Sequence, residues 1–251
     1  MTTCVIMKFW NEEQLLPLTL GQFADSGIDC LNLFDDGSTD DSFNVAYNII
    51  KDFPFKTSLT KASAPHARYF PNDTPEPESG LLNRMIDSAK GYDWCIQVDA
   101  DEVICNWWFM PWIHKQTPST TAIRVPFFHL VDKIDKFIIT MPGLSYNLHP
   151  DYHVRIFRPN CWRFPDQPGL DAIIRPISPG DMYMKVLTFS GIIHLHYLDA
   201  NRRGLRNGDE STEDGDKQAA FRKPGCTYGT VPDALMPGIL TDWYASRKPG
   251  W

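Results

Sequence analysis

The fold-deciding stretch is Trp94-Cys95-Ile96-Gln97-Val98-Asp99-Ala100-Asp101-Glu102, an apolar run that ends in acidic residues. The apolar part predicts a short buried strand, 94–98. Side chains alternate between the two faces of a strand, so we expect Asp99 and Asp101 to point the same way. In open α/β sheets ligands bind at the carboxyl ends of strands. Two carboxylates there form an oxygen-only site suited to Mg²⁺ or Mn²⁺, and a solvated acidic turn is the alternative interpretation.

A second acidic strand end lies upstream, in Leu33-Phe34-Asp35-Asp36-Gly37-Ser38-Thr39-Asp40. At such a position Asp35 and Asp36 can accept hydrogen bonds from a uracil-type N–H or from ribose hydroxyls. A turn followed by a helix cap is the alternative. We favour the binding role, because a cap does not need two carboxylates.

Strands and helices alternate over the first part of the chain. We expect strands at 3–9, 28–34, 55–59 and 94–98. Three helices are expected: one capped by Asn11 and ended by Gly27, one capped by 38–41 and running to about Asp52, and one from Gly80 to Ala89. This alternation predicts an α/β domain with a mostly parallel sheet and right-handed crossovers. Further on, 106–115 predicts a short helix, in which Trp108 and Trp112 share one face. Strands are expected at 122–130, 136–140, 153–158 and 187–198.

The two acidic motifs in this order resemble the glycosyltransferases of family 2, which have a GT-A fold. Lys8-Phe9-Trp10-Asn11-Glu12-Glu13 is also similar to the first strand of that family and its Asn-Glu-Glu turn. The resemblance covers about the first 105 residues. It implies transfer of a hexosyl or pentosyl group from a nucleoside diphosphate sugar, UDP- or GDP-linked, with a divalent cation, Mn²⁺ or Mg²⁺, at the Asp-x-Asp motif. The acceptor would be a hydroxyl of a glycan, glycoprotein or glycolipid, and the anomeric centre would be inverted.

The resemblance also implies roles for single residues on the donor side. Asp35 and Asp36 would bind the nucleoside, and Asn11 and Glu12 would contact the donor. Asp99 would contribute to both donor and metal binding. Helix capping is the alternative for Asn11 and Glu12.

Asn83 and Arg84 lie on the helix before the Asp-x-Asp strand, where related enzymes place a residue that faces the donor. The Arg84 guanidinium would offset the charge of the pyrophosphate. A solvated helix face is the alternative for both residues.

Metal binding is expected from Asp99 and Asp101, completed by a late histidine. His194 and His196 form His-Leu-His on a predicted strand, so both imidazoles can face one side. An imidazole ligand suits Mn²⁺ better than Mg²⁺. A core histidine bonded to the backbone is the alternative; His194 is our first choice, because it follows the apolar Ile192-Ile193.

Inverting transfer needs a general base that takes the proton of the acceptor hydroxyl. In a related subgroup the corresponding segment ends in His-Glu, with the acid as the base, whereas here it reads Leu170-Asp171. We expect Asp171 to be the base, with Asp166, Asp151 and Asp132 as rivals. An Asp that caps a turn is the alternative.

Composition narrows the class of protein. The chain has 251 residues and a net charge of −7, and no long basic run suggests nucleic-acid binding. No apolar run approaches the length of a transmembrane segment, and the N-terminus lacks a signal-peptide pattern. The cysteines are far apart, which predicts free thiols in a reducing compartment; they are Cys4, Cys30, Cys95, Cys105, Cys161 and Cys226. We expect a cytoplasmic protein, unless its acceptor holds it at a membrane surface.

We expect one GT-A domain over 1–200, followed by a C-terminal extension or wrap over 201–251. Within the domain, 1–105 would be the nucleotide-sugar-binding half and 106–200 the acceptor-side half. One alternative is a nucleotidylyltransferase, but the turn Trp10-Asn11-Glu12-Glu13 is acidic and lacks the glycines that hold a triphosphate. Another is a catalytically silent carbohydrate-binding relative, which would lose a metal carboxylate, whereas Asp99 and Asp101 are both present.

Overall fold

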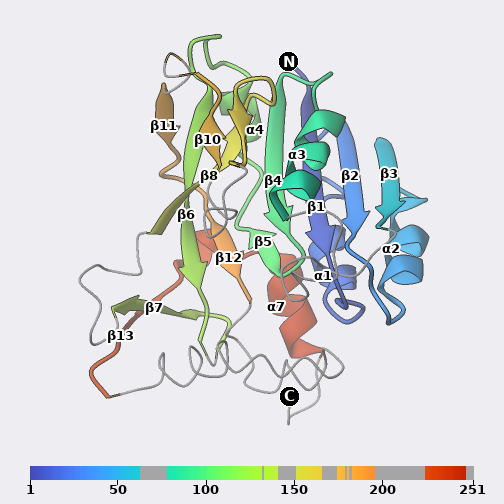
Figure 1. Cartoon of the computed structure of the whole chain (residues 1–251). Coiled ribbons are helices and arrows are strands. Elements are labelled where there is room, and N and C mark those ends of the chain that lie inside the picture. The colour runs from blue at the N-terminus through green and yellow to red at the C-terminus, as the bar shows by residue number, and fades with distance from the viewer. Residues whose placement is uncertain are drawn as a thin grey trace. The chain divides into compact units, whose positions relative to one another are not determined.

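The computed structural model describes residues 1–62, 78–131, 133–140, 151–165, 174–178, 180, 183–195 and 224–246 (Figure 1). The chain forms two compact units, each assembled from separate stretches. The first unit takes Met1–Ala100, Met110–Arg124 and Val154–Val186. The second takes Asp101–Phe109, Val125–His153 and Leu187–Trp251.

The first unit is built on a parallel sheet. Its first strands and helices are β1 (Thr3–Phe9), α1 (Leu16–Gly21), β2 (Cys30–Asp35), α2 (Ser42–Ile50), β3 (Lys56–Lys61), α3 (Glu78–Ser88) and β4 (Trp94–Asp99). The four strands lie in the order β3-β2-β1-β4, all parallel. The chain moves outward from β1 to β3 and then returns to the other side of β1. Ligands bind at such a reversal, beyond the carboxyl ends of the strands.

Helices cover both faces of this sheet (Figure 1). On one face, Leu82, Met85 and Ile86 of α3 pack in a buried cluster with Cys4 of β1 and Cys30 of β2. Side chains that alternate with these point to the other face, where α1 and α2 pack against each other. Both faces of β1, β2 and β4 are therefore buried, as their near-continuous apolar sequences require.

The remaining elements of the first unit are short. They are α4 (Met110–Ile113), β9 (Trp162–Arg163), β10 (Arg175–Pro176) and β11 (Met184–Val186), together with parts of β6 (Ala122–His129) and β8 (Asp151–Phe157). β8 pairs antiparallel with β4, through Cys95↔Phe157 and Ile96↔Ile156. β11 runs parallel to the beginning of β6.

Two predicted helices are shorter than expected. α1 begins only at Leu16, because Pro17 is tolerated in the first turn and not further inside a helix. The helix predicted over 106–115 is reduced to α4, because the Asn106 side chain accepts the Trp108 N–H and forms a turn there. The expectation that Trp108 and Trp112 share a helix face is wrong, since Trp108 precedes the helix and is 76% exposed.

The second unit contains most of β6 and the beginning of β8. Its other elements are β5 (Glu102–Ile104), β7 (Lys136–Thr140), β12 (Ile192–His194), β13 (Thr227–Thr230), the 3₁₀ helix η2 (Asp233–Leu235) and α7 (Gly238–Ala245). β12 lies between β6, to which it is parallel, and β5, to which it is antiparallel. β7 pairs with β13, so part of the predicted C-terminal extension completes a small sheet of this unit.

β12 approaches β6 closely because residue 191, just before it, is a glycine. A Cβ at Gly191 would lie 2.7 Å from the Phe128 ring and 2.9 Å from the carbonyl oxygen of Pro126. Any larger residue at this position would force the two strands apart. The register that results places His194 beside His129.

The cysteines are free thiols, as predicted, and Cys4, Cys30, Cys95 and Cys105 are buried. Burial raises the pKa of Cys95 and brings the pKa of Cys105 to about 12, which keeps both thiols protonated and unreactive. Within the described ranges, no helix has both the length and the apolar character needed to span a bilayer.

Candidate functional site

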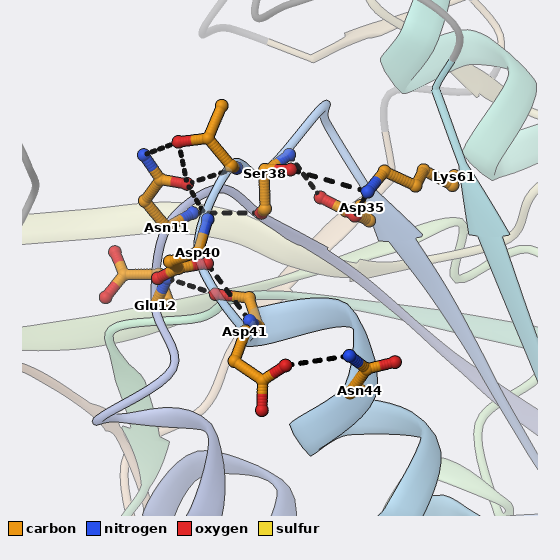
Figure 2. Close-up of polar contacts among 10 residues, drawn as sticks. Asn11, Glu12, Asp35, Ser38, Asp40, Asp41, Asn44 and Lys61 are labelled. Carbon is orange, nitrogen blue, oxygen red and sulfur yellow. Dashed lines mark hydrogen bonds and ion pairs between the residues drawn. The ribbon is translucent and has the colours of Figure 1, made fainter.

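Asp35 ends β2 in the first unit and is only 1% exposed. Its Oδ1 accepts the Ser38 N–H at 2.7 Å, across a turn in which Gly37 has a φ of 83° (Figure 2). That left-handed backbone conformation favours glycine. Lys61 Nζ, at the end of the neighbouring β3, lies 3.6 Å from Asp35 Oδ2. Among the residues that the structure describes, this buried oxygen has no hydrogen-bond partner, so it can accept a hydrogen bond from a ligand.

Asn11 joins the loop after β1 to the loop after β2 (Figure 2). Its Oδ1 accepts the Thr39 N–H at 2.8 Å, and its own N–H donates to Ser38 Oγ at 3.0 Å. Asn11 has a φ of 50°, in the left-handed region that asparagine tolerates better than most residues. It does not cap the helix that follows it, as one interpretation proposed, because α1 begins five residues later. The contacts instead hold the Asp35 turn in a fixed conformation.

Glu12 is buried beside Asn11, with 6% exposure, and its N–H donates to Ser42 Oγ at 2.7 Å. The first amides of α2 and its N-cap are satisfied by other acids. Asp40 accepts the Ser42 N–H, and Glu13 accepts the Asp41 N–H. Asp35 is therefore not needed to cap α2, which favours the interpretation of this strand end as a binding site.

Cations balance the acidic side chains at this edge of the first unit. Lys8 Nζ of β1 lies 4.0 Å from Asp36 Oδ2, and Asp36 is 4% exposed. Asp99 ends β4, next to Lys8 in the strand register, and its Oδ2 accepts a hydrogen bond from Arg155 at 3.0 Å. Each of these carboxylates is therefore paired with a side chain of opposite charge.

Asp101 begins the second unit and contacts a histidine that is distant in the sequence. Its Oδ2 lies 3.3 Å from His194 Nε2, and both side chains are largely buried. β4 ends at Asp99 and a turn follows, so the alternation rule does not extend to Asp101. The two acids of the Asp-x-Asp motif thus have different partners, Arg155 for Asp99 and His194 for Asp101.

A line of imidazoles continues from His194. His194 Nδ1 lies 3.0 Å from His129 Nδ1, and His129 Nε2 lies 3.3 Å from Asp151 Oδ2. His153 Nε2 contacts the same Asp151 oxygen at 2.8 Å. Burial alone would raise the pKa of Asp151, but the hydrogen bonds from His129 and His153 outweigh it and hold this pKa well below its usual range. Asp151 is therefore an ionised hydrogen-bond acceptor at neutral pH.

The other predicted residues have different surroundings. The Asn83 side chain makes two hydrogen bonds of 2.9 Å with the backbone of Phe164, and Arg84 is on the exposed side of α3. Asp171 and His196 lie outside the described residues, as do the rival bases Asp166 and Asp132. Their predicted roles stay predictions.

Sequence reasoning gave no role to Lys61, Arg155, His129 or His153. A signal for some of them was present in β8, where Asp151, His153 and Arg155 occupy alternate positions. Alternate residues of a strand share a face, so this pattern predicts three polar side chains on one face of the strand. His129, in contrast, ends a strand that is mostly apolar, and its contact with His194 follows from the register of β6 with β12.

No family model and no curated protein sequence matches this chain. Among solved structures, it is similar to residues 1–349 of S. aureus TarS, with a TM-score of 0.50 and 14% identity over 87% of this chain and 69% of that one. The same part of TarS in complex with UDP gives a TM-score of 0.51, with the same identity and coverage. These neighbours are GT-A glycosyltransferases, and the chain has their fold, an α/β fold with a mostly parallel central sheet, as the sequence predicted.

Proposed function

We propose that this protein is a metal-dependent glycosyltransferase that moves a sugar from a UDP- or GDP-sugar to a hydroxyl acceptor with inversion. The observation that carries the proposal is the 3.3 Å contact between Asp101 and His194. Two residues that were expected on separate grounds to bind a metal are neighbours in a chain with the GT-A fold. The UDP complex of TarS supports a uridine nucleotide as the first donor to test.

Asp35 and Asp36 are assigned to the nucleoside. The buried Oδ2 of Asp35 has no hydrogen-bond partner in the described part of the chain, and a ribose hydroxyl or a base N–H would supply a donor. Asn11 holds the turn that carries these acids. Glu12, which lies beside Asn11, is assigned to contact the donor. Lys8 lies 4.0 Å from Asp36 and would also attract the diphosphate.

The residues of the second unit fit a divalent cation. In the described part of the chain, no cluster of three or more His, Cys, Asp or Glu side chains could hold a metal alone. Asp101 and His194 would therefore supply two ligands, and donor phosphates and water the others, the usual arrangement for such cations. One oxygen and one nitrogen ligand favour Mn²⁺ over Mg²⁺. A cation bound there acts as a Lewis acid and stabilises the negative charge of the departing diphosphate.

Asp99 and the general base complete the proposal. Asp99 forms an ion pair with Arg155, and 37% of its side chain is exposed, so a donor can still reach it. Asp171 is the proposed base, and it would take the proton of the acceptor hydroxyl. Among its rivals, Asp151 already accepts hydrogen bonds from His129 and His153, which disfavours it as a base.

The test is hydrolysis of a panel of UDP- and GDP-sugars, with and without Mn²⁺, because slow hydrolysis reveals a donor without its acceptor. We expect one donor to be hydrolysed only with metal, and Asp101→Asn to abolish this. Asp135→Asn is the matched control, since Asp135 is an exposed acid of the same unit. Binding of a donor without hydrolysis or transfer would favour a silent relative. Formation of a nucleotide-sugar from a nucleoside triphosphate and a sugar phosphate would favour a nucleotidylyltransferase.

A further inference from the structure

Beyond the pair assigned to the metal, the second unit contains three more side chains in one line of polar contacts. The line runs from Asp101 through His194 and His129 to Asp151, with His153 on the same Asp151 oxygen. Its side chains are 11% exposed at Asp101, 19% at His194 and 15% at His129. Hydrogen bonds in such a partly buried place fix the orientation of each ring.

The contact between the two imidazoles restricts where their protons lie. His194 Nδ1 and His129 Nδ1 are 3.0 Å apart, so one of them must donate and the other accept. When His194 binds a metal through Nε2, that nitrogen has no proton. A neutral His194 then has its proton on Nδ1 and donates it to His129 Nδ1.

The same reasoning extends to the carboxylate. With an accepting Nδ1, a neutral His129 has its proton on Nε2, which lies 3.3 Å from Asp151 Oδ2. An ionised carboxylate accepts this hydrogen bond, and the contacts with His129 and His153 hold the pKa of Asp151 below its usual range. With both imidazoles neutral and a metal on His194 Nε2, each N–H in the line therefore faces an acceptor.

We infer that Asp151, acting through His129, is a positioning residue that holds His194 in the ring orientation and tautomer of a metal ligand. The inference rests on the proposed function, because it takes His194 as a ligand. Partners behind a metal-binding histidine typically contribute about 10–100-fold to metal affinity. Asp151 then has a role in metal binding and not in proton abstraction from the acceptor.

The experiment measures the affinity of the full chain for Mn²⁺ alone, by calorimetry at one pH. Asp151→Asn keeps the size of the side chain, but its amide can donate to His129 and permits the opposite tautomer. We expect Mn²⁺ binding about tenfold weaker or more. In His129→Gln the amide lies near the position of Nε2, so it keeps the contact with Asp151 and loses the one with His194. We expect a similar loss.

The matched control is His153→Gln, which changes the other imidazole on Asp151 and should leave Mn²⁺ affinity within about threefold. The melting temperature of each metal-free variant separates stability from binding. A purely structural role for Asp151 would lower that temperature and leave Mn²⁺ affinity unchanged, and this result overturns the inference. His194→Ala tells the two proposals apart. If it binds Mn²⁺ normally, the metal site itself is wrong and the inference fails with it; if only Asp151→Asn and His129→Gln bind normally, the inference alone fails.

Discussion

The acidic side chains of the two units have partners of different chemistry. In the first unit three carboxylates lie beside cationic side chains, in the pairs Asp35–Lys61, Asp36–Lys8 and Asp99–Arg155. In the second unit the partners are imidazoles, in the pairs Asp101–His194, Asp151–His129 and Asp151–His153. The first arrangement offsets the charge of each carboxylate with a cationic side chain. The second couples them to groups that a metal can bind.

This difference separates two tasks that the sequence presents as a single acidic signature. Carboxylates paired with Lys or Arg are neutralised in part, so they suit hydrogen bonds to hydroxyl and N–H groups better than a divalent cation. A carboxylate beside an imidazole offers oxygen and nitrogen ligands together. We therefore expect substitutions in the first unit to affect nucleoside binding and those in the second to affect metal dependence.

The largest effect is expected from Asp171, a carboxylate that belongs to neither the cation-paired nor the imidazole-paired set. Asp171→Asn keeps size and hydrogen bonding and removes basicity, so kcat should fall by about 10²–10⁴-fold while donor affinity stays nearly constant. Steady-state kinetics with the donor found in the hydrolysis panel measures both. A normal kcat would show that Asp171 is structural, and the search would move to Asp166, Asp132 and Asp151.

Replacing Asp101 of the second unit should separate the metal-dependent part of nucleotide binding from the metal-independent part. Asp101→Ala should weaken Mn²⁺-dependent UDP binding by about a hundredfold, because a ligand of the cation is lost. Affinity without metal should change little. Calorimetry with and without Mn²⁺ decides this, and Asp135→Ala serves as the exposed control. Unchanged Mn²⁺-dependent affinity would remove Asp101 from the metal site.

The complementary change in the first unit is Asp35→Asn. It keeps an acceptor for the Ser38 N–H but loses the charge, so UDP binding should weaken by about tenfold, both with and without Mn²⁺. The same titrations measure it. An effect seen only when Mn²⁺ is present would assign Asp35 to metal binding. It would contradict the assignment of nucleoside binding to the first unit and metal binding to the second.

Lowering the pH should remove the stability that Asp151 gains from its imidazole partners. The folded-state pKa of Asp151 is below its unfolded value, so its contribution to stability is complete above about pH 4 and is lost as the pH falls through the folded pKa. The difference in melting temperature between the wild type and Asp151→Asn should therefore narrow below about pH 4. Thermal melts from pH 7 to pH 3 test this. A difference that stays constant throughout would contradict it.

The smallest effect is expected at the exposed cation of the first unit. Lys61 is 48% exposed and lies 3.6 Å from Asp35, so Lys61→Gln should change the free energy of unfolding by no more than about 1 kcal/mol. UDP affinity should change by no more than about threefold. Chemical denaturation and calorimetry provide the two values, and a tenfold loss of UDP affinity would show that Lys61 itself contacts the nucleotide.

Much of the fold could be predicted because its main strands are buried on both faces. β1 matches its prediction, and β2 and β4 differ from theirs only at the ends. The ends of the helices were harder to predict, because side chains that can cap a helix can also have other partners. Asn11 is in a left-handed conformation and binds the loop after β2, which local sequence does not show.

The site was predictable where its chemistry is local. Asp35 and Asp36 follow an apolar strand, and the sequence alone identifies that strand end. The contacts of Asp99 with Arg155, and of His194 with His129, join strands that are distant along the chain. Their pairing depends on strand order and register, which no local pattern contains.

Gly191 has a consequence for how sequences like this one can diverge. It contributes no chemistry, yet a single methyl group there would collide with Phe128 and Pro126 at the beginning of β12. The displacement would be transmitted along the strand to His194 and would lengthen its contact with His129. A smaller side chain in place of Phe128 would relieve only one of the two collisions, because the Pro126 oxygen belongs to the backbone. A descendant of this sequence is therefore expected to keep this glycine even where the exposed residues around the two histidines vary.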